Sequence, residues 1–142
     1  MIYREIIKND FSNWSILIQE LWPMNAKELK DEFNELFTTQ TGIGAFDNDN
    51  LVGVVHVAIR TDYVAGTSTS PVGYIEGIVV HKSMRKQGIA SELLNQASLF
   101  AKSKGCTEMG SDIEIDNKES LGFHIKNGYI EKERVIALSR KI

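Results

Sequence analysis

A long amphipathic segment in the second half of the chain constrains the fold most. Residues 88–104 carry apolar side chains at the spacing of one helical face, and Gly105 follows as a stop signal. The stripe consists of Ile89, Ala90, Leu93, Leu94, Ala97, Phe100 and Ala101. The short apolar run at 74–80 comes before it and is typical of a strand. A strand, a connection and a long helix predict a mixed α/β or α+β sheet covered by helices.

The remaining periodic segments fit the same fold class. Further strands are predicted at 2–7, 43–46, 51–60, 107–115 and 129–138, and further helices at about 10–21, 25–37 and 117–127. Asp10 and Asn25 are expected to cap the first two helices, and DNDN is expected to close a hairpin. The long loop 61–73 is of a kind that often carries function. No repeat or linker divides the chain, which predicts a single domain over 1–142.

Composition and charge exclude several classes of function. The net charge of −3, from 16 Lys and Arg against 19 Asp and Glu, argues against nucleic-acid binding and leaves a cationic substrate open. The charged N-terminus and the absence of a long apolar run predict neither a signal peptide nor a membrane span, and hence a cytoplasmic protein. Cys106, the single cysteine, is expected to be a small buried hydrophobe rather than a reactive thiol. His56 and His81 lack partners at metal-ligand spacing, so no metal is expected.

The connection between strand and helix, MRKQGIA, has the features of an anion site. Free backbone N–H groups at the start of a helix bind anions, and glycine lets a ligand approach the backbone closely. Arg85 and Lys86 add positive charge beside Gly88, a combination suited to a diphosphate. An ordinary turn with solvated cations fits the letters equally well. The Gly-Lys-Ser/Thr ending of a P-loop and the three-glycine dinucleotide motif are both missing.

The spacing of this connection resembles a known family. Arg85-x-x-Gly88-x-Ala90, after the apolar strand, resembles the acetyl-CoA pyrophosphate motif of the GNAT superfamily of N-acetyltransferases. Asn117-x-x-Ser120 and Asn127-Gly128-Tyr129 look like that family's downstream signatures. More closely, LWP at 21–23 and the segments 62–80, 105–112 and 115–129 are similar to the aminoglycoside 6′-N-acetyltransferases.

The resemblance implies a fold, a reaction and an assembly. The fold would be a bent sheet splayed at its middle strands, with the pantetheine arm of acetyl-CoA in the splay. The reaction would be direct transfer of the acetyl group from acetyl-CoA to the 6′-amine of an aminoglycoside, and the enzyme would be a homodimer. Two alternatives stay open: the same chemistry on a polyamine, small metabolite or protein lysine, and a non-catalytic acyl-CoA-binding domain.

The resemblance also implies which residues bind the cofactor. The backbone of Ile78, Val79 and Val80 would pair with the pantetheine amides, and Asn117 would hydrogen-bond the cofactor. The diphosphate would lie on the segment Arg85, Lys86, Gln87, Gly88, Ile89, Ala90 and Ser91.

Glu76 is the candidate catalytic residue. An amine must lose its proton before it attacks a thioester, so a base is needed close to the acetyl group. Glu76 lies in the middle of the strand 74–80, two residues from the cofactor-binding backbone, where an unpaired buried carboxylate would be costly. The alternative is a salt-bridged or solvent-facing glutamate on a strand.

Several residues are candidates for contact with a cationic substrate. Asp112, Glu114 and Asp116 alternate along the expected strand 107–115, as an acidic binding face or as a charged edge that discourages aggregation. The resemblance favours substrate contact for Asp112, and it also points to Trp22, Tyr63 and Glu133. The plain alternatives for these last three are a core aromatic, a loop surface residue and a strand salt bridge.

One position departs from the family. Many members have a tyrosine seven residues after the asparagine, placed to protonate the departing thiolate, and this chain has His124 there. His124 could donate a proton at neutral pH or could be a helix-face histidine without a chemical role, which we favour. Tyr129 is expected to pack rather than to act as an acid.

Overall fold

The computed structural model describes residues 1–142, which form two compact units. The first unit, Met1–Ser111, holds every strand and three of the four α-helices, and the second, Asp112–Ile142, holds the last helix. Each unit is described below by itself, and the single domain stays a prediction.

The first unit is built on a five-stranded sheet with its strands in chain order. The strands are β1 (Ile2–Glu5), β2 (Gln40–Asp47), β3 (Asn50–Arg60), β4 (Val72–Val80) and β5 (Met109–Gly110). Neighbours are antiparallel except β4 and β5, which are parallel. The hairpin between β2 and β3 is confirmed, and Asn48 takes the left-handed conformation, with φ 55°, that such a tight turn requires.

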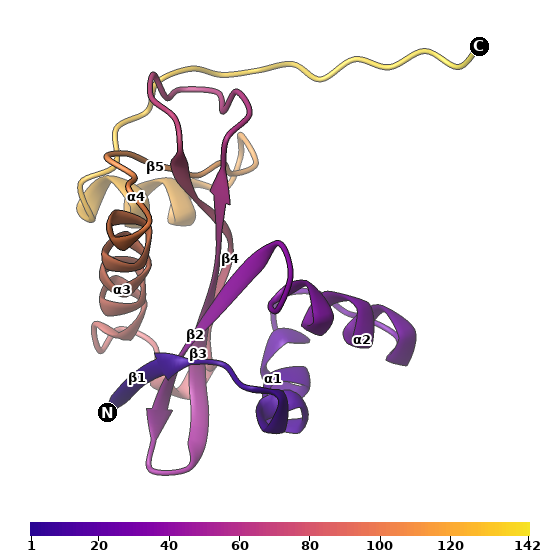
Figure 1. Cartoon of the computed structure of the whole chain (residues 1–142), viewed down its shortest axis with the longest axis vertical. Helices are drawn as coiled ribbons and strands as arrows, with labels where there is room; N and C mark the ends of the chain where they lie inside the picture. Colours follow the sequence, from indigo (N-terminus) through magenta and orange to yellow (C-terminus); the bar gives the residue numbers. More distant parts are fainter. The chain divides into compact units, whose positions relative to one another are not determined.

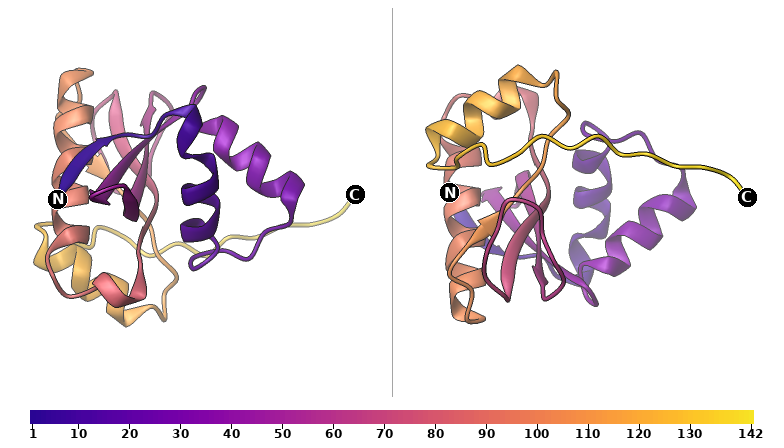
Figure 2. Two further views of the ribbon diagram at one scale, coloured as in Figure 1. Left: turned by 90° about the horizontal axis from the view of Figure 1, so that it is seen from below. Right: turned by 90° about the horizontal axis from the view of Figure 1, so that it is seen from above.

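Helices cover both faces of this sheet. α3 (Ile89–Ser103) packs against β2, β3 and β4 on one face, and α1 (Phe11–Ile18) packs against β3 and β4 on the other, with α2 (Ala26–Glu35) beside it (Figure 1). The views along the other axis show the same three layers (Figure 2). The core on the α1 side gathers Trp14, Leu17, Phe33, Val54 and Val79. The fold class predicted from the sequence is confirmed.

The two predicted N-caps have different outcomes. Asn25 caps α2 as expected, because its side chain accepts a hydrogen bond of 2.8 Å from the Glu28 N–H. Asp10 precedes α1 without capping it. Its carboxylate instead pairs with Arg4 at 2.8 Å and accepts the Ile7 N–H, so it ties β1 to the following turn.

Two predicted strands are wrong or shortened. β5 covers only two residues of the expected 107–115. Asp112 lies in an irregular segment, and Glu114 and Asp116 lie in a turn closed by the Asn117 N–H on the Glu114 carbonyl at 3.0 Å, so the expected ladder of carboxylates on a strand does not form. The segment 129–138 has the alternation of a strand but forms none.

The second unit contains α4 (Lys118–Lys126) followed by an extended tail. The predicted end of the helix is confirmed, with Gly128 at φ 88° directly after it. The tail then runs without regular structure to the C-terminus (Figure 1). Its apolar side chains are exposed, with Ile136 at 85% and Leu138 at 90%. No α-helix in the structure has the length and apolar character needed to cross a bilayer.

Candidate active site

A β-bulge places Glu76 at the edge of a pocket. His56 on β3 lies opposite Gly77, whereas its neighbour Val57 lies opposite Ile75, so Glu76 is an extra residue on β4. A bulge bends its strand and redirects a side chain. Glu76 is half-buried and lines a pocket of about 400 Å³ together with residues from the end of β3 and the loop after it. The remaining lining residues are Thr39, Ala58, Ile59, Arg60, Thr61, Asp62 and Tyr63.

Arg60 holds the Glu76 carboxylate. The Arg60 Nη2 and Nε atoms donate to the same oxygen, Glu76 Oε1, at 2.7 and 3.1 Å. The guanidinium also stacks on the Tyr74 ring, 3.6 Å from its centroid. The salt-bridged glutamate weighed as an alternative is therefore present, and the same carboxylate also faces the pocket. The two interpretations of Glu76 are compatible.

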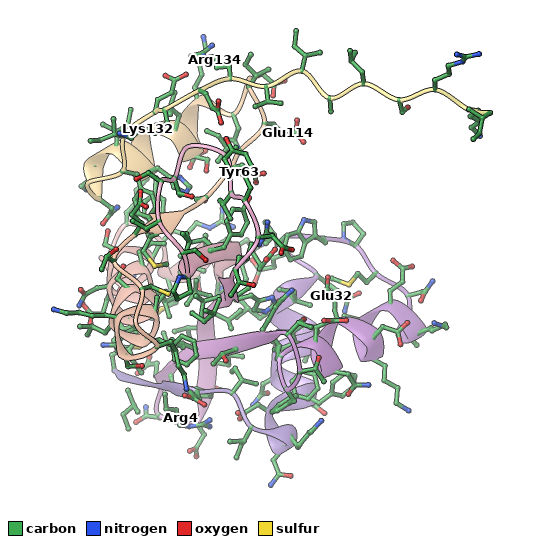
Figure 3. The ribbon with its side chains drawn as sticks, turned by 45° about the horizontal axis from the view of Figure 1, so that its top comes forward. Arg4, Glu32, Tyr63, Glu114, Lys132 and Arg134 are labelled. Atoms are coloured by element: carbon green, nitrogen blue, oxygen red, sulfur yellow. The ribbon has the colours of Figure 1, made fainter.

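Two aromatic residues predicted to contact substrate lie near Glu76. The Trp22 ring packs on the β4 backbone, since a Cβ atom at Gly77 would overlap Trp22 Cη2 and lie 3.2 Å from Cζ3. Trp22 is still 37% exposed, which leaves part of its ring for a ligand. Tyr63 is 80% exposed on the loop after β3 (Figure 3). It lines the same pocket as Glu76.

Negative charge gathers around this pocket. Burial raises the pKa of Glu32 on α2, and the nearby carboxylates of Glu35 and Glu76 raise it further. Asp62 lines the pocket directly. Sequence reasoning missed Arg60, Asp62 and Glu32. The only signal for them was charge at the end of a strand and on a helix face, which does not reveal a shared pocket.

The connection before α3 keeps its backbone open. Gly88 is left-handed, with φ 83° and ψ 2°, and no side chain caps the N–H groups of the first turn of α3. A Cβ atom at Gly88 would meet nothing within 4 Å, so the space above the backbone is free. Arg85 Nε donates to the Val80 carbonyl at 3.0 Å and braces the connection against the end of β4. The geometry is compatible with an anion site, one of the two interpretations that the sequence left open.

The end of β4 has an unpaired edge. β5 pairs only with Gly73 and Tyr74, so from Ile75 to Val80 the strand has a neighbour on the β3 side alone. Backbone N–H and C=O groups on such an edge can hydrogen-bond to another chain or to a ligand. Ile78, Val79 and Val80 lie on this edge and lead into the connection before α3, so the residues present fit an extended amide-bearing arm ending in a diphosphate, as acetyl-CoA has.

Three predicted site residues belong to the second unit. Asp112 and Glu133 are exposed, the latter on the tail. Asn117 is the N-cap of α4, where its Oδ1 accepts the Ser120 N–H at 3.1 Å, which leaves the Nδ2 amide for a ligand. Their roles as site residues remain predictions.

His124 has the geometry of a helix-face residue. Its Nδ1 lies 2.7 Å from the Ser120 carbonyl oxygen, which only accepts, so Nδ1 carries the proton in the neutral ring. Tyr129 packs edge-on against the His124 ring at 5.2 Å, and burial raises the pKa of Tyr129 to about 12. Both observations favour packing over acid catalysis. Cys106 is buried as expected, and burial raises the pKa of its thiol.

The chain is similar to known acetyltransferases. The sequence pattern of the acetyltransferase (GNAT) family matches residues 4–129. The aminoglycoside N(6′)-acetyltransferase type 1 of Acinetobacter haemolyticus is 35% identical, over 92% of this chain and 91% of the relative. The protein of the same description from Serratia marcescens is 37% identical over 87% of each.

Solved structures give the same result. The apo aminoglycoside 6′-N-acetyltransferase of Acinetobacter haemolyticus matches with a TM-score of 0.93 and 33% identity, over 100% of this chain and 99% of that one. A second enzyme, AAC(6′)-Iy in complex with the bisubstrate analog CoA-S-monomethyl-acetylneamine, matches with a TM-score of 0.93 and 30% identity, over 99% and 98%.

Proposed function

The chain belongs to the acetyltransferase (GNAT) family, and from this we propose that it transfers the acetyl group of acetyl-CoA to the 6′-amino group of aminoglycoside antibiotics. The observation that carries the proposal is the position of Glu76, bulged into an acidic pocket beside the unpaired edge of β4. Curated relatives of nearly the same length are named for this reaction.

Backbone groups would bind and activate the co-substrate, which supplies the acetyl thioester when bound. The unpaired edge of β4 at Ile78, Val79 and Val80 offers N–H and C=O groups to the pantetheine amides. A β4 N–H directed at the acetyl carbonyl would stabilise the negative charge that develops there during attack. The free N–H groups from Gln87 to Ser91, with Arg85 and Lys86 beside them, would hold the diphosphate.

Glu76 would accept the proton of the acceptor's ammonium. The neutral amine then attacks the carbonyl carbon, a C–N bond forms, the C–S bond breaks and the thiolate leaves. The new amide nitrogen loses its remaining extra proton to solvent, and the thiolate takes up a proton from solvent. No covalent enzyme intermediate is needed. The one thiol of the chain, Cys106, is buried with a raised pKa and is unsuited to carry an acyl group.

The pocket suits a polycation. Glu32, Asp62 and Glu76 supply negative charge, while Trp22 and Tyr63 offer flat surfaces for sugar rings. We assign Asp112 and Glu133 to further contacts with the drug's amines and Asn117 Nδ2 to the cofactor.

Thiol release from acetyl-CoA tests the proposal. We expect release with kanamycin-type drugs that carry a 6′-amine and none with a 6′-hydroxyl analogue. Release only with a polyamine or a lysine peptide would keep the reaction and replace the substrate. Binding of acetyl-CoA without release with any amine would favour a non-catalytic acyl-CoA-binding domain.

We also propose that the chain works in the cytoplasm as a homodimer. The exposed apolar tail after α4 has strand-like alternation and no partner strand, and the outer edge of β5 is unpaired. Pairing of the tail with a second copy would bury these side chains. Light scattering coupled to size exclusion should give twice the mass of 15.9 kDa, and a chain ending at Gly128 should give the single mass.

A further inference from the structure

The ion pair between Arg60 and Glu76 is built more tightly than an ordinary surface pair. The guanidinium donates through both Nε and Nη2, at 3.1 and 2.7 Å, which fixes the direction from which it approaches the carboxylate. Both bonds end on Oε1. The second carboxylate oxygen, Oε2, is left to interact with a ligand in the pocket that both residues line.

Arg60 is itself held in place. Its guanidinium stacks on the Tyr74 ring at 3.6 Å, and Tyr74 is buried, with 7% of its surface exposed, in the part of β4 that pairs with both neighbours. Arg60 pairs across the strands with Val72, so its side chain runs along β4 to reach the bulge at Glu76. Through Arg60 and Tyr74, the carboxylate is therefore held against the part of β4 that pairs with both neighbouring strands.

Stability alone does not account for this arrangement. The Arg60 and Glu76 side chains are 40% and 23% exposed, and ion pairs in contact with water add little to folding. The chain contains a comparable arrangement elsewhere: Arg4 pairs with Asp10 at 2.8 Å and stacks on Phe46 at 3.9 Å. That pair lies at the opposite edge of the sheet and lines no part of the pocket.

We propose that Arg60 is a positioning residue for acetyl transfer: it fixes Oε1 of Glu76 and so presents Oε2 to the ammonium of the incoming amine. The proposal rests on the proposed function, in which Glu76 is the base. Because a carboxylate on a bulge has several free torsions, loss of Arg60 would let it turn away from the productive direction. The positive charge of Arg60 beside a cationic acceptor is offset by Asp62 and Glu32.

Steady-state kinetics of Arg60→Met test this role. We expect kcat to fall about 10- to 100-fold while the KM for acetyl-CoA changes less than about twofold. Arg60→Lys keeps the charge but loses the two-pronged contact and the stacking, so its kcat should recover only in part. It also serves as the second variant should Arg60→Met not fold. Arg4→Met is the matched control, expected to lower the melting temperature and leave kcat unchanged.

A double-mutant cycle separates positioning from a general structural role. If Arg60 acts through Glu76, Arg60→Met should change kcat by less than about twofold in a Glu76→Gln background. An equal loss of kcat in both backgrounds, or an unchanged kcat in Arg60→Met alone, would overturn the assignment of Arg60 and leave the proposed function standing. A wild-type chain that releases no thiol with any amine would overturn the proposed function and this proposal with it.

Discussion

The connection before α3, which we propose binds acetyl-CoA, and the pocket around Glu76, which we propose binds the amine, are built in different ways. The connection is one continuous segment whose parts are backbone: a left-handed Lys86 and Gly88, uncapped N–H groups and a brace from Arg85 to Val80. The pocket is made of side chains from β3, β4 and the loop after β3, together with Thr39, and these are far apart in the sequence.

This difference determines what a sequence reveals. A backbone site needs particular residue types at fixed local spacing, so Arg85, Gly88 and Ala90 could be proposed from their spacing and its resemblance to a family motif. A side-chain site depends on register. Arg60 contacts Glu76 because β3 and β4 pair with one extra residue, Glu76, on β4. Nothing in the sequence of either strand predicts this bulge.

The largest effect that would separate the two regions is expected for Glu76→Gln. The amide keeps the size of the side chain but accepts no proton at neutral pH, so kcat should fall about 10²- to 10⁴-fold. The affinity for acetyl-CoA, measured by calorimetry, should stay within about twofold. Normal turnover in this variant would show that Glu76 is not the base.

Acid should weaken the strand that supports the pocket. His56, opposite Gly77, is almost fully buried and accepts the Trp14 Nε1 hydrogen bond at 3.0 Å, and burial lowers its pKa from 6.5 to about 4. The unfolded chain protonates His56 below pH 6.5, whereas the folded chain does so only near pH 4. The free energy of unfolding is therefore highest above pH 6.5 and decreases as the pH falls from 6.5 toward 4. The loss amounts to about 3 kcal/mol.

Urea unfolding at a series of pH values measures this dependence. His56→Gln does not titrate and can still accept the Trp14 hydrogen bond, so its stability should vary less between pH 6.5 and 4 than that of the wild type. His81→Gln changes a half-buried histidine, whose side chain is 42% exposed, and is the control. Equal pH dependence in wild type and His56→Gln would contradict the role of His56.

Gly88→Val should damage the backbone site and spare the pocket. A β-branched residue is strained at φ 83°, and its side chain would fill the space open to a ligand. The Kd for acetyl-CoA should rise at least about 100-fold, by calorimetry, and the strained backbone should lower the melting temperature by a few degrees, roughly what 1–3 kcal/mol of local strain produces. Gly122→Ala, in α4 with open space around it, is the control and should bind normally.

Gly77→Ala should have the smallest effect and should act on the pocket alone. The new methyl group would push the Trp22 ring off β4, and this half-exposed ring can move without disturbing the core. The KM for the aminoglycoside should rise about 10-fold as a flat wall of the pocket is displaced. An equal rise in the KM for acetyl-CoA would place Trp22 in the cofactor site instead.

The strands and helices of the first unit were largely predictable because each has a local signal, such as the Asn25 cap or the DNDN turn. The segment 129–138 was not, although Ile130, Ile136 and Leu138 alternate with polar residues as in a strand. Alternation reports that a segment is suited to pairing, whereas a strand forms only beside a partner, and this chain provides none there. The strand predicted through Asp112 and Glu114 was wrong for the same reason, since β5 ends before these residues.

The half-paired β4 has a consequence for the protein's stability. A strand paired on one side over Ile75–Val80 is an exposed edge, and such edges template the addition of strands from other chains. An extended amide-bearing ligand seated there acts as a removable sixth strand. Because such a ligand binds only the folded chain, a rise in its concentration would raise the free energy of unfolding and cover the exposed edge.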